Sequence, residues 1–482
     1  MRPSDPWGGP KILTKKRNGT YTWQVIAGSA ALGLVVAAGA VLAAGPWDNG
    51  QRKAERALAA AGDRTGGAHH GRPTPDGPRP APSAPAVLPA LGTTTHDAPQ
   101  DAAALRDTLA PLIGDPGLGD EVAASVVDTA TGEQLYGQGA TTPMTPASTI
   151  KIATATAALS VLGPDHRIAT TAALSPDSRT VTLVGGGDPT LSRAALRAMA
   201  ADTADALREE DRDSVRLAYD ISRYTGPVLH PISPNENIAP VTALMVNEGR
   251  VNDTDRGPAK RTDDPAGDAA RTFAAALKKA GVKVSGAPRE ARAAEEARTV
   301  ATHRSAPLDA LVERTLTNSD NDIAEALARQ TAIAKGESAS FAGARRAVTN
   351  ELKKLKVPMA GAHFADGSGL DRRDRATPAL LTALLARAAD PDRPGLRPVL
   401  TGLPIAGFSG TLGGRYAPDA AGTGLIRAKT GTLRGVNSLA GTVVDRQGRL
   451  LAFAFLASGS IDAGQAEPAL DALATALAGT GG

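Results

Sequence analysis

The sequence predicts an α+β fold in which strands from both ends of the folded chain share one antiparallel sheet, with helices from the intervening chain packed around it. Two pairs of apolar runs separated by turn residues predict hairpins, one formed by 122–127 and 134–136 and the other by 438–444 and 450–456. The chain between them has mostly helical periodicity. The hydrophobic share of 42% and the charged share of 21% are typical of a globular protein with a sizeable core.

Three further elements complete this expectation. Residues 102–113 predict a short helix before the first hairpin, and residues 424–432 predict a strand before the second. Residues 467–478 carry leucines at helical spacing and predict an amphipathic closing helix. We expect the first and last strands to be neighbours in the sheet.

Composition excludes several classes of function. The 53 Lys and Arg residues nearly balance the 50 Asp and Glu residues and form no basic stripe, so nucleic acid is not an expected partner. Only 3% of residues are aromatic, which argues against a base-stacking surface. The absence of cysteine excludes disulfides, thiolate metal sites and a cysteine nucleophile.

The N-terminus predicts export from the cytoplasm. Residues 25–45 are apolar and uncharged, long enough for a transmembrane helix, and the basic residues before them predict a cytoplasmic tail at 1–24. Small residues near Ala43 suit a signal peptidase, so cleavage and secretion is the alternative to a membrane anchor. Residues 46–100 are rich in Pro and Ala and predict an extended linker outside the cell membrane.

The first chemical motif is Ser148-Thr149-Ile150-Lys151, which opens an alanine-rich helix. A spacing of three residues places Ser148 and Lys151 one turn apart on the same face. A lysine amine in that position can remove the serine proton if burial lowers its pKa. Alone the motif is weak, because an N-cap serine followed by a solvated lysine has the same pattern.

Two more motifs follow at long intervals. Ser319-Asp320-Asn321 lies at a predicted break between two helices, where a polar run can enter a cleft or simply cap a helix. Lys429-Thr430-Gly431 lies on the strand predicted at 424–432, where glycine permits a ligand backbone to approach closely. The order S-x-x-K, S-D-N, K-T-G is the signature of penicillin-binding proteins and class A β-lactamases.

Flanking sequences narrow this resemblance. The blocks are LGPDHR (162–167), GGGDPTL (185–191), SAPL (305–308), DGSGL (366–370) and RAKTGTLRGVNSLAG (427–441). Together with the motifs they resemble the D-alanyl-D-alanine carboxypeptidase/endopeptidase family, peptidase family S13, the low-molecular-mass class C penicillin-binding proteins. The resemblance implies a serine β-lactamase/transpeptidase-like domain in two parts, 101–165 and 300–482, interrupted by a mostly β accessory domain at 166–299.

The resemblance also implies roles for the motif residues. Ser148 would be the nucleophile, Lys151 its general base, and Ser319 the relay that carries the proton to the leaving D-Ala amine. The substrate-binding residues it implies are Asn321, Lys429, Thr430, Gly431 and Thr432, and the backbone N–H groups of Ser148 and Thr432 would form the oxyanion hole.

The expected substrates are peptidoglycan stem peptides, with β-lactam antibiotics as inhibitors, and the expected partner of the N-terminal helix is the membrane. No cofactor or metal is expected for this chemistry, and the chain has no H-E-x-x-H motif of a zinc peptidase. Two alternatives remain open. One is a β-lactamase, which the long interval between Ser148 and Ser319 disfavours, and the other is a non-enzymatic cell-wall sensor.

Overall fold

The computed structural model describes residues 98–233, 235–460 and 462–479. The predicted cytoplasmic tail, the helix at 25–45 and nearly all of the linker lie outside the described residues. None of the helices in the described part of the chain has the length and apolar character needed to span a bilayer.

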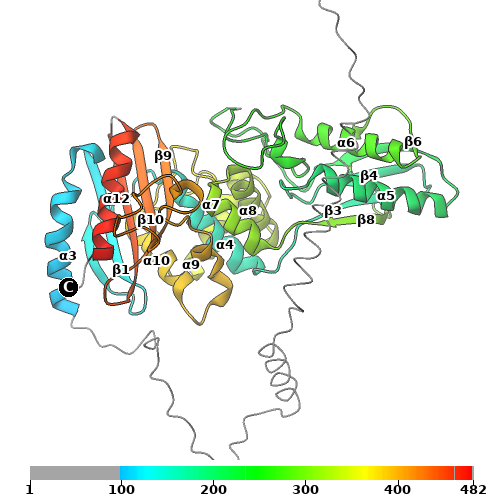
Figure 1. The fold of residues 1–482 in the computed structure, drawn as a ribbon. Coiled ribbons are helices and arrows are strands. Elements are labelled where there is room, and N and C mark those ends of the chain that lie inside the picture. The colour runs from blue at the N-terminus through cyan, green and yellow to red at the C-terminus, as the bar shows by residue number, and fades with distance from the viewer. Residues whose placement is uncertain (1–97, 234, 461, 480–482) are drawn as a thin grey trace, which may run out of the picture. The chain divides into compact units, whose positions relative to one another are not determined.

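A five-stranded antiparallel sheet has the strand order β2-β1-β11-β10-β9 (Figure 1). The strands are β1 (Glu121–Asp128), β2 (Gln134–Gln138), β9 (Ile426–Leu433), β10 (Val436–Val444) and β11 (Leu450–Ser458). Strand β1 pairs with β11, where Ser125 lies opposite Ala454. The two predicted hairpins and the pairing of the first strand with the last are therefore confirmed.

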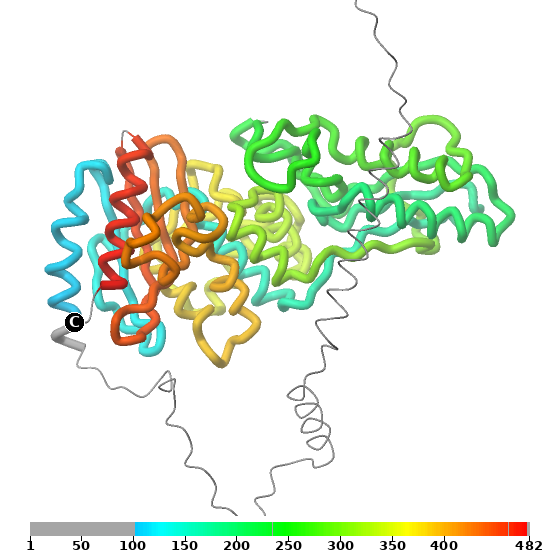
Figure 2. The backbone as a smooth tube through the Cα atoms, in the orientation of Figure 1, coloured from blue at the N-terminus to red at the C-terminus, as the bar shows by residue number. Residues whose placement is uncertain are grey.

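Helices cover both faces of this sheet because its central strands are apolar on both sides. On β11, Phe453 and Phe455 belong to the core shared with α3 (Ala98–Ile113) and α12 (Ala463–Gly479). The alternating residues Ala452 and Ala454 belong to the opposite core, with the central helices. Helices α3 and α12, the first and last of the described chain, lie side by side (Figure 2).

The central helices surround α4 (Lys151–Leu162), which is buried from Lys151 to Leu159. Its small alanine and threonine side chains let neighbours approach on every side. Those neighbours are α7 (Leu308–Asn318), α8 (Asn321–Ala334), α9 (Phe341–Lys354), α10 (Pro378–Ala389) and the short α11 (Pro398–Thr401). The helix that carries the first motif is thus held from all sides.

A second sheet lies between α4 and α7 in the sequence, in the order β6-β5-β4-β3-β8, with β7 also paired to β5. Its elements are β3 (Ala169–Leu174), β4 (Thr180–Val184), α5 (Arg193–Glu209), β5 (Ser214–Asp220), α6 (Pro265–Lys279), β6 (Lys283–Val284), β7 (Arg289–Glu290) and β8 (Arg298–Arg304). The domain boundary expected at 299 falls inside β8.

The expectation that this inserted segment is mostly β is wrong. Helix α5 has 17 residues and α6 has 15, and both pack into the core of the second sheet. The reason is topological: β4 and β5 are parallel, so the chain must cross over between them, and α5 makes that connection. Between β5 and α6, the described residues 221–233 and 235–264 contain one short 3-10 helix, η3 (Asn247–Gly249). This stretch reaches α8, where Asn237 and Ala239 make hydrogen bonds with Asn321 and Asp322.

Candidate active site

Ser148 lies in the 3-10 turn η2 (Ala147–Ile150), which leads directly into α4 at Lys151. Ala147 has a left-handed backbone, with φ of 48°, and so turns the chain sharply just before Ser148. The Thr149 hydroxyl donates to the Pro146 carbonyl at 2.7 Å. These features fix the serine at the start of a helix that is buried from Lys151 to Leu159.

The Lys151 amine is fully buried and makes three hydrogen bonds. It donates to Ser148 Oγ at 2.9 Å, to Asn321 Oδ1 at 2.7 Å and to the Ser368 carbonyl at 2.5 Å. An ammonium has three donors, and these three acceptors use all of them. Loss of one proton leaves a lone pair that can accept the Ser148 proton.

Burial lowers the pKa of Lys151 to about 8, although four acidic residues oppose this shift: Asp366, Asp320, Glu325 and Asp374. At pH 7 this value leaves about a tenth of the amine neutral, against less than a thousandth at the ordinary lysine pKa. A usable fraction of Lys151 is therefore in the form that can act as a base.

The second motif lies at the junction of α7 and α8. Ser319 ends α7 with a left-handed backbone, φ 58°, and the Asp320 carboxylate caps α8 by accepting from the Ile323 N–H at 3.0 Å. Asn321 bonds Lys151 through its oxygen and donates through Nδ2 to the Asn237 carbonyl of the inserted segment at 3.0 Å. Within the described part of the chain the Ser319 hydroxyl makes no hydrogen bond, so it is free to meet a ligand.

The third motif lies on β9, the edge strand of the five-stranded sheet. The backbone of Ala428 donates to the Pro404 carbonyl, away from β10. Because backbone groups alternate along a strand, those of Thr430 and Thr432 also face the outer edge. The Thr432 N–H is therefore available to a ligand.

Gly431 lies against the Ser148 turn. A Cβ at this position would lie 2.7 Å from the Pro146 carbonyl oxygen and 3.0 Å from the Ser148 nitrogen. Only glycine lets β9 approach the turn this closely. The contact brings the backbone of the third motif beside the N–H of Ser148.

Lys429 is fully buried, and its amine donates to the Thr430 carbonyl at 2.8 Å. Burial, and then the positive charge of Lys151, hold the pKa of Lys429 well below its ordinary value. The Thr430 hydroxyl donates to the Thr411 hydroxyl at 2.8 Å. The structure thus joins Ser148, Lys151 and Asn321 directly and places Gly431 against the Ser148 turn, while the charge of Lys151 acts on the buried Lys429.

The Ser368 carbonyl is the site contact that the sequence did not reveal. The DGSGL block is a recognisable motif, and the glycines on either side of Ser368 indicate a tight turn. Asp366 does hold that turn, accepting from the Ser368 N–H at 2.9 Å and the Gly369 N–H at 2.6 Å. The contact of the Ser368 carbonyl with the Lys151 amine is visible only in the folded structure.

Within the part of the chain that the structure describes, two buried groups have the composition of a cation site, each with ligand atoms within 4.8 Å of one another: His230, Glu325 and Asp366, and Glu248, Asp320 and Asp322. In both groups carboxylates already contact protein cations or donors. The contacts are His230–Asp366 at 2.8 Å, Arg250–Glu248 at 2.8 Å and Arg261–Asp322 at 2.9 Å. The carboxylates of both groups are thus bound to protein side chains.

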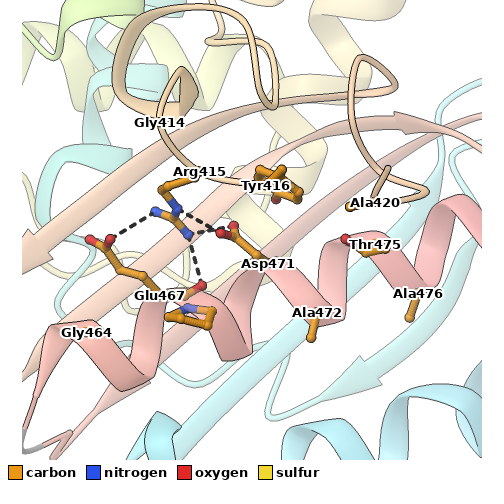
Figure 3. Close-up of a pocket in the computed structure, with 11 residues that line it drawn as sticks. Gly414, Arg415, Tyr416, Ala420, Gly464, Glu467, Asp471, Ala472, Thr475 and Ala476 are labelled. Atoms are coloured by element: carbon orange, nitrogen blue, oxygen red, sulfur yellow. Dashed lines mark hydrogen bonds and ion pairs between the residues drawn. The ribbon is translucent and has the colours of Figure 1, made fainter. Parts of the chain in front are cut away.

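An open pocket of about 680 Å³ lies between the chain around 414–420 and α12 (Figure 3). The Arg415 guanidinium bonds the Asp471 carboxylate at 2.6 Å, and Glu467 on the same helix accepts from the Thr432 hydroxyl at 3.3 Å. Through Glu467 the pocket wall contacts the end of β9.

Comparisons with known proteins agree with this arrangement. A carboxypeptidase of Mycobacterium tuberculosis is 38% identical over 420 residues, which cover 83% of this chain and 88% of the relative. The D-alanyl-D-alanine carboxypeptidase of an Actinomadura species is 31% identical over 462 residues, covering 78% and 84%. The fold is similar to the crystal structure of penicillin-binding protein 4 from Haemophilus influenzae, with a TM-score of 0.64 and 21% identity over 77% of this chain and 98% of that one.

The family model described as D-Ala-D-Ala carboxypeptidase 3 (S13) matches residues 105–260 and 253–479, a span that includes all three motifs. With relatives aligned over most of their own length and the motifs gathered around Ser148, the chain belongs to the D-Ala-D-Ala carboxypeptidase family S13.

Proposed function

We propose that this chain is a serine D-Ala-D-Ala carboxypeptidase that cleaves peptidoglycan stem peptides through an acyl-enzyme on Ser148. The observation that carries the proposal is the 2.9 Å contact between Ser148 Oγ and the buried Lys151 amine. A serine hydrolase needs a nucleophile with a base beside it, and Ser148 and the buried Lys151 form such a pair. Endopeptidase action is the same chemistry on a cross-linked peptide.

The reaction begins when Ser148 Oγ attacks the carbonyl carbon of the penultimate D-Ala and the Lys151 amine takes the serine proton. The N–H groups of Ser148 and Thr432 stabilise the oxyanion, a contribution of about 3 to 4 kcal/mol for each donor. When the C–N bond breaks, Ser319 relays a proton from Lys151 to the departing D-Ala amine. Water then attacks the ester, and the same pair works in reverse.

The remaining motif residues orient the substrate. The hydroxyls of Thr430 and Thr432 turn from Thr411 and Glu467 to bind the terminal carboxylate. Asn321 holds a substrate amide as well as Lys151. Lys429 lies directly beneath Thr430, and its amine favours the substrate carboxylate when it is protonated. Gly431 keeps the edge strand close to the nucleophile.

A β-lactam undergoes the same attack by Ser148. Its ring amine stays attached to the acyl group after the ring opens, and it blocks the position in which Lys151 would activate a water molecule. We therefore expect a long-lived penicilloyl-enzyme. The Haemophilus influenzae protein of similar fold has been crystallised with a β-lactam, which supports this class of ligand.

The test is intact mass against time after one pulse of penicillin. An adduct that lasts many minutes and is absent in Ser148→Ala supports the proposal, as does D-Ala release from a D-Ala-D-Ala peptide. Rapid multiple turnover of penicillin would indicate a β-lactamase. A folded sample that forms no adduct would favour a non-enzymatic sensor.

We further propose that residues 25–45 place the catalytic part outside the cytoplasm, as a membrane anchor or as a cleaved signal. The apolar run and the basic residues before it support this location, which is also where peptidoglycan lies. Cell fractionation with mass spectrometry of the mature N-terminus distinguishes an anchor from a signal, and a cytoplasmic full-length chain would contradict both.

A further inference from the structure

His230 belongs to the inserted segment, yet its side chain is buried against the central helices. Its Nε2 lies 2.8 Å from Asp366 Oδ2, with the two side chains 1% and 0% exposed. The other ring nitrogen, Nδ1, accepts from the Ile232 N–H at 3.3 Å. Since Nδ1 accepts, Nε2 carries the proton and donates to Asp366.

Asp366 connects His230 to the loop at 365–371. One of its oxygens accepts from the Ser368 and Gly369 N–H groups, and the other accepts from the Asp371 N–H at 2.8 Å in addition to His230. The carbonyl of Ser368 in turn binds the Lys151 amine. A continuous series of contacts therefore runs from His230 through Asp366 and Ser368 to Lys151.

The pKa of Asp366 is lowered, whereas the pKa values of the neighbouring buried acids Asp374 and Glu325 are raised. Burial alone would raise the pKa of Asp366, but the His230 hydrogen bond and the loop amides hold it at about 2. Burial and the adjacent Asp366 raise the pKa of Asp374 to about 10. Burial also raises the pKa of Glu325. Asp366 is also the strongest of the acidic influences on Lys151.

We propose that His230 is a positioning residue for the general base: it anchors the Asp366 carboxylate and thereby fixes the loop whose Ser368 carbonyl binds the Lys151 amine. The inference rests on the proposed role of Lys151. It gives the inserted segment a part in building the active site rather than only in binding substrate.

The competing explanation is packing alone, since the His230 ring also makes an edge contact with Phe341 at 5.4 Å between ring centres. Two substitutions separate the explanations. His230→Phe keeps an aromatic ring but removes the donor, whereas His230→Gln loses the ring and places an amide N–H near the Nε2 position.

The experiment measures the rate of Ser148 acylation by a fluorescent penicillin in the full chain, from pH 5.5 to 9.5. We expect His230→Phe to acylate at least tenfold more slowly and to show an altered pH profile. We expect His230→Gln to stay within about threefold of the wild type, with an unchanged profile. Equal losses in both variants, or no loss in His230→Phe, would overturn the proposal.

Asp366→Asn provides a second test if His230→Phe fails to fold. Removing the negative charge should move the acid limb of the acylation profile to lower pH by about one unit, because the lysine then loses its proton more easily. An unshifted limb in a folded Asp366→Asn sample would overturn the proposal. If the wild type itself is not acylated at Ser148, the proposed function fails instead, so the two failures are distinguishable.

Discussion

Gly431→Ala tests how closely the third motif must approach the nucleophile. The added Cβ would lie 2.3 Å from Ser438 Oγ, 2.7 Å from the Pro146 oxygen and 3.0 Å from the Ser148 nitrogen. Ordinary contact begins at 3.4 Å, so Pro146 must retreat by about 0.7 Å and Ser148 by about 0.4 Å. The Ser438 side chain can rotate, but the other two contacts are backbone atoms of the Ser148 turn.

A misplacement of about 1 Å at reacting atoms can reduce a rate about 10²-fold. We therefore expect Gly431→Ala to slow penicillin acylation at Ser148 by about 10-fold to 10²-fold. The global fold should survive, because the clash falls on one turn at the edge of the sheet. Stopped-flow acylation with a fluorescent penicillin measures the rate, and thermal unfolding checks the fold.

Gly414→Ala is the matched control, because a Cβ at Gly414 would meet no atom within 4 Å. It should acylate at the wild-type rate. The double variant Gly431→Ala/Ser438→Ala removes the shortest clash and leaves the two backbone clashes, so it should stay slow. An acylation rate for Gly431→Ala within threefold of the wild type would refute the argument that β9 and the Ser148 turn form the oxyanion site by close contact.

Three other outcomes are expected. Since burial lowers the pKa of Lys151 to about 8, the acylation rate should rise about tenfold per pH unit below pH 8 and level off above it; a profile flat from pH 6 to 8 would contradict a lysine base. Arg261→Ala leaves the buried Asp322 carboxylate without its cation and should lower the free energy of unfolding by about 3 kcal/mol at pH 8. The loss should be smaller at pH 6, because burial raises the pKa of Asp322 to about 7 and a protonated carboxyl needs no cation; urea unfolding at both pH values measures this, and equal losses would count against it. A chain beginning at Ala98 should fold and acylate like the full chain, because all three motifs and the strands of both sheets follow that residue; a folded but unreactive sample would show that the N-terminal segment takes part in the chemistry.

Local patterns were enough to predict the five-stranded sheet. The apolar runs of β10 and β11 flank a turn, and the leucines of α12 repeat at helical spacing, so short-range signals determine these elements. The predicted break between two helices at 318–322 is confirmed as the junction of α7 and α8. Turns, helix breaks and helical spacing depend on residues that are close together in the sequence, so the sequence alone predicts them.

The inserted segment was predicted less well because its fold class came from the family resemblance rather than from its own periodicity. Leu196, Met199, Ala200 and Leu207 repeat at helical spacing and are all buried in α5, so the signal for a helix was present. The contacts of Lys151 with Ser368 and of His230 with Asp366 join residues more than a hundred positions apart. No spacing rule predicts such pairs, and only the packed structure reveals them.

The inserted segment reaches the motif residues by independent routes. Its Asn237 carbonyl binds Asn321, its Ala239 N–H donates to Asp322 at 2.9 Å, and its Arg261 pairs with the same carboxylate. His230 provides a fourth contact, to Asp366. Without the segment, Asp322 would lose Arg261 and Asp366 would lose His230, and Asp366 is the acid with the strongest influence on Lys151. The segment inserted between the first and second motifs therefore contributes to the electrostatic environment that sets the pKa of Lys151. We expect inserted segments to be exchangeable between relatives only when these four contacts are kept.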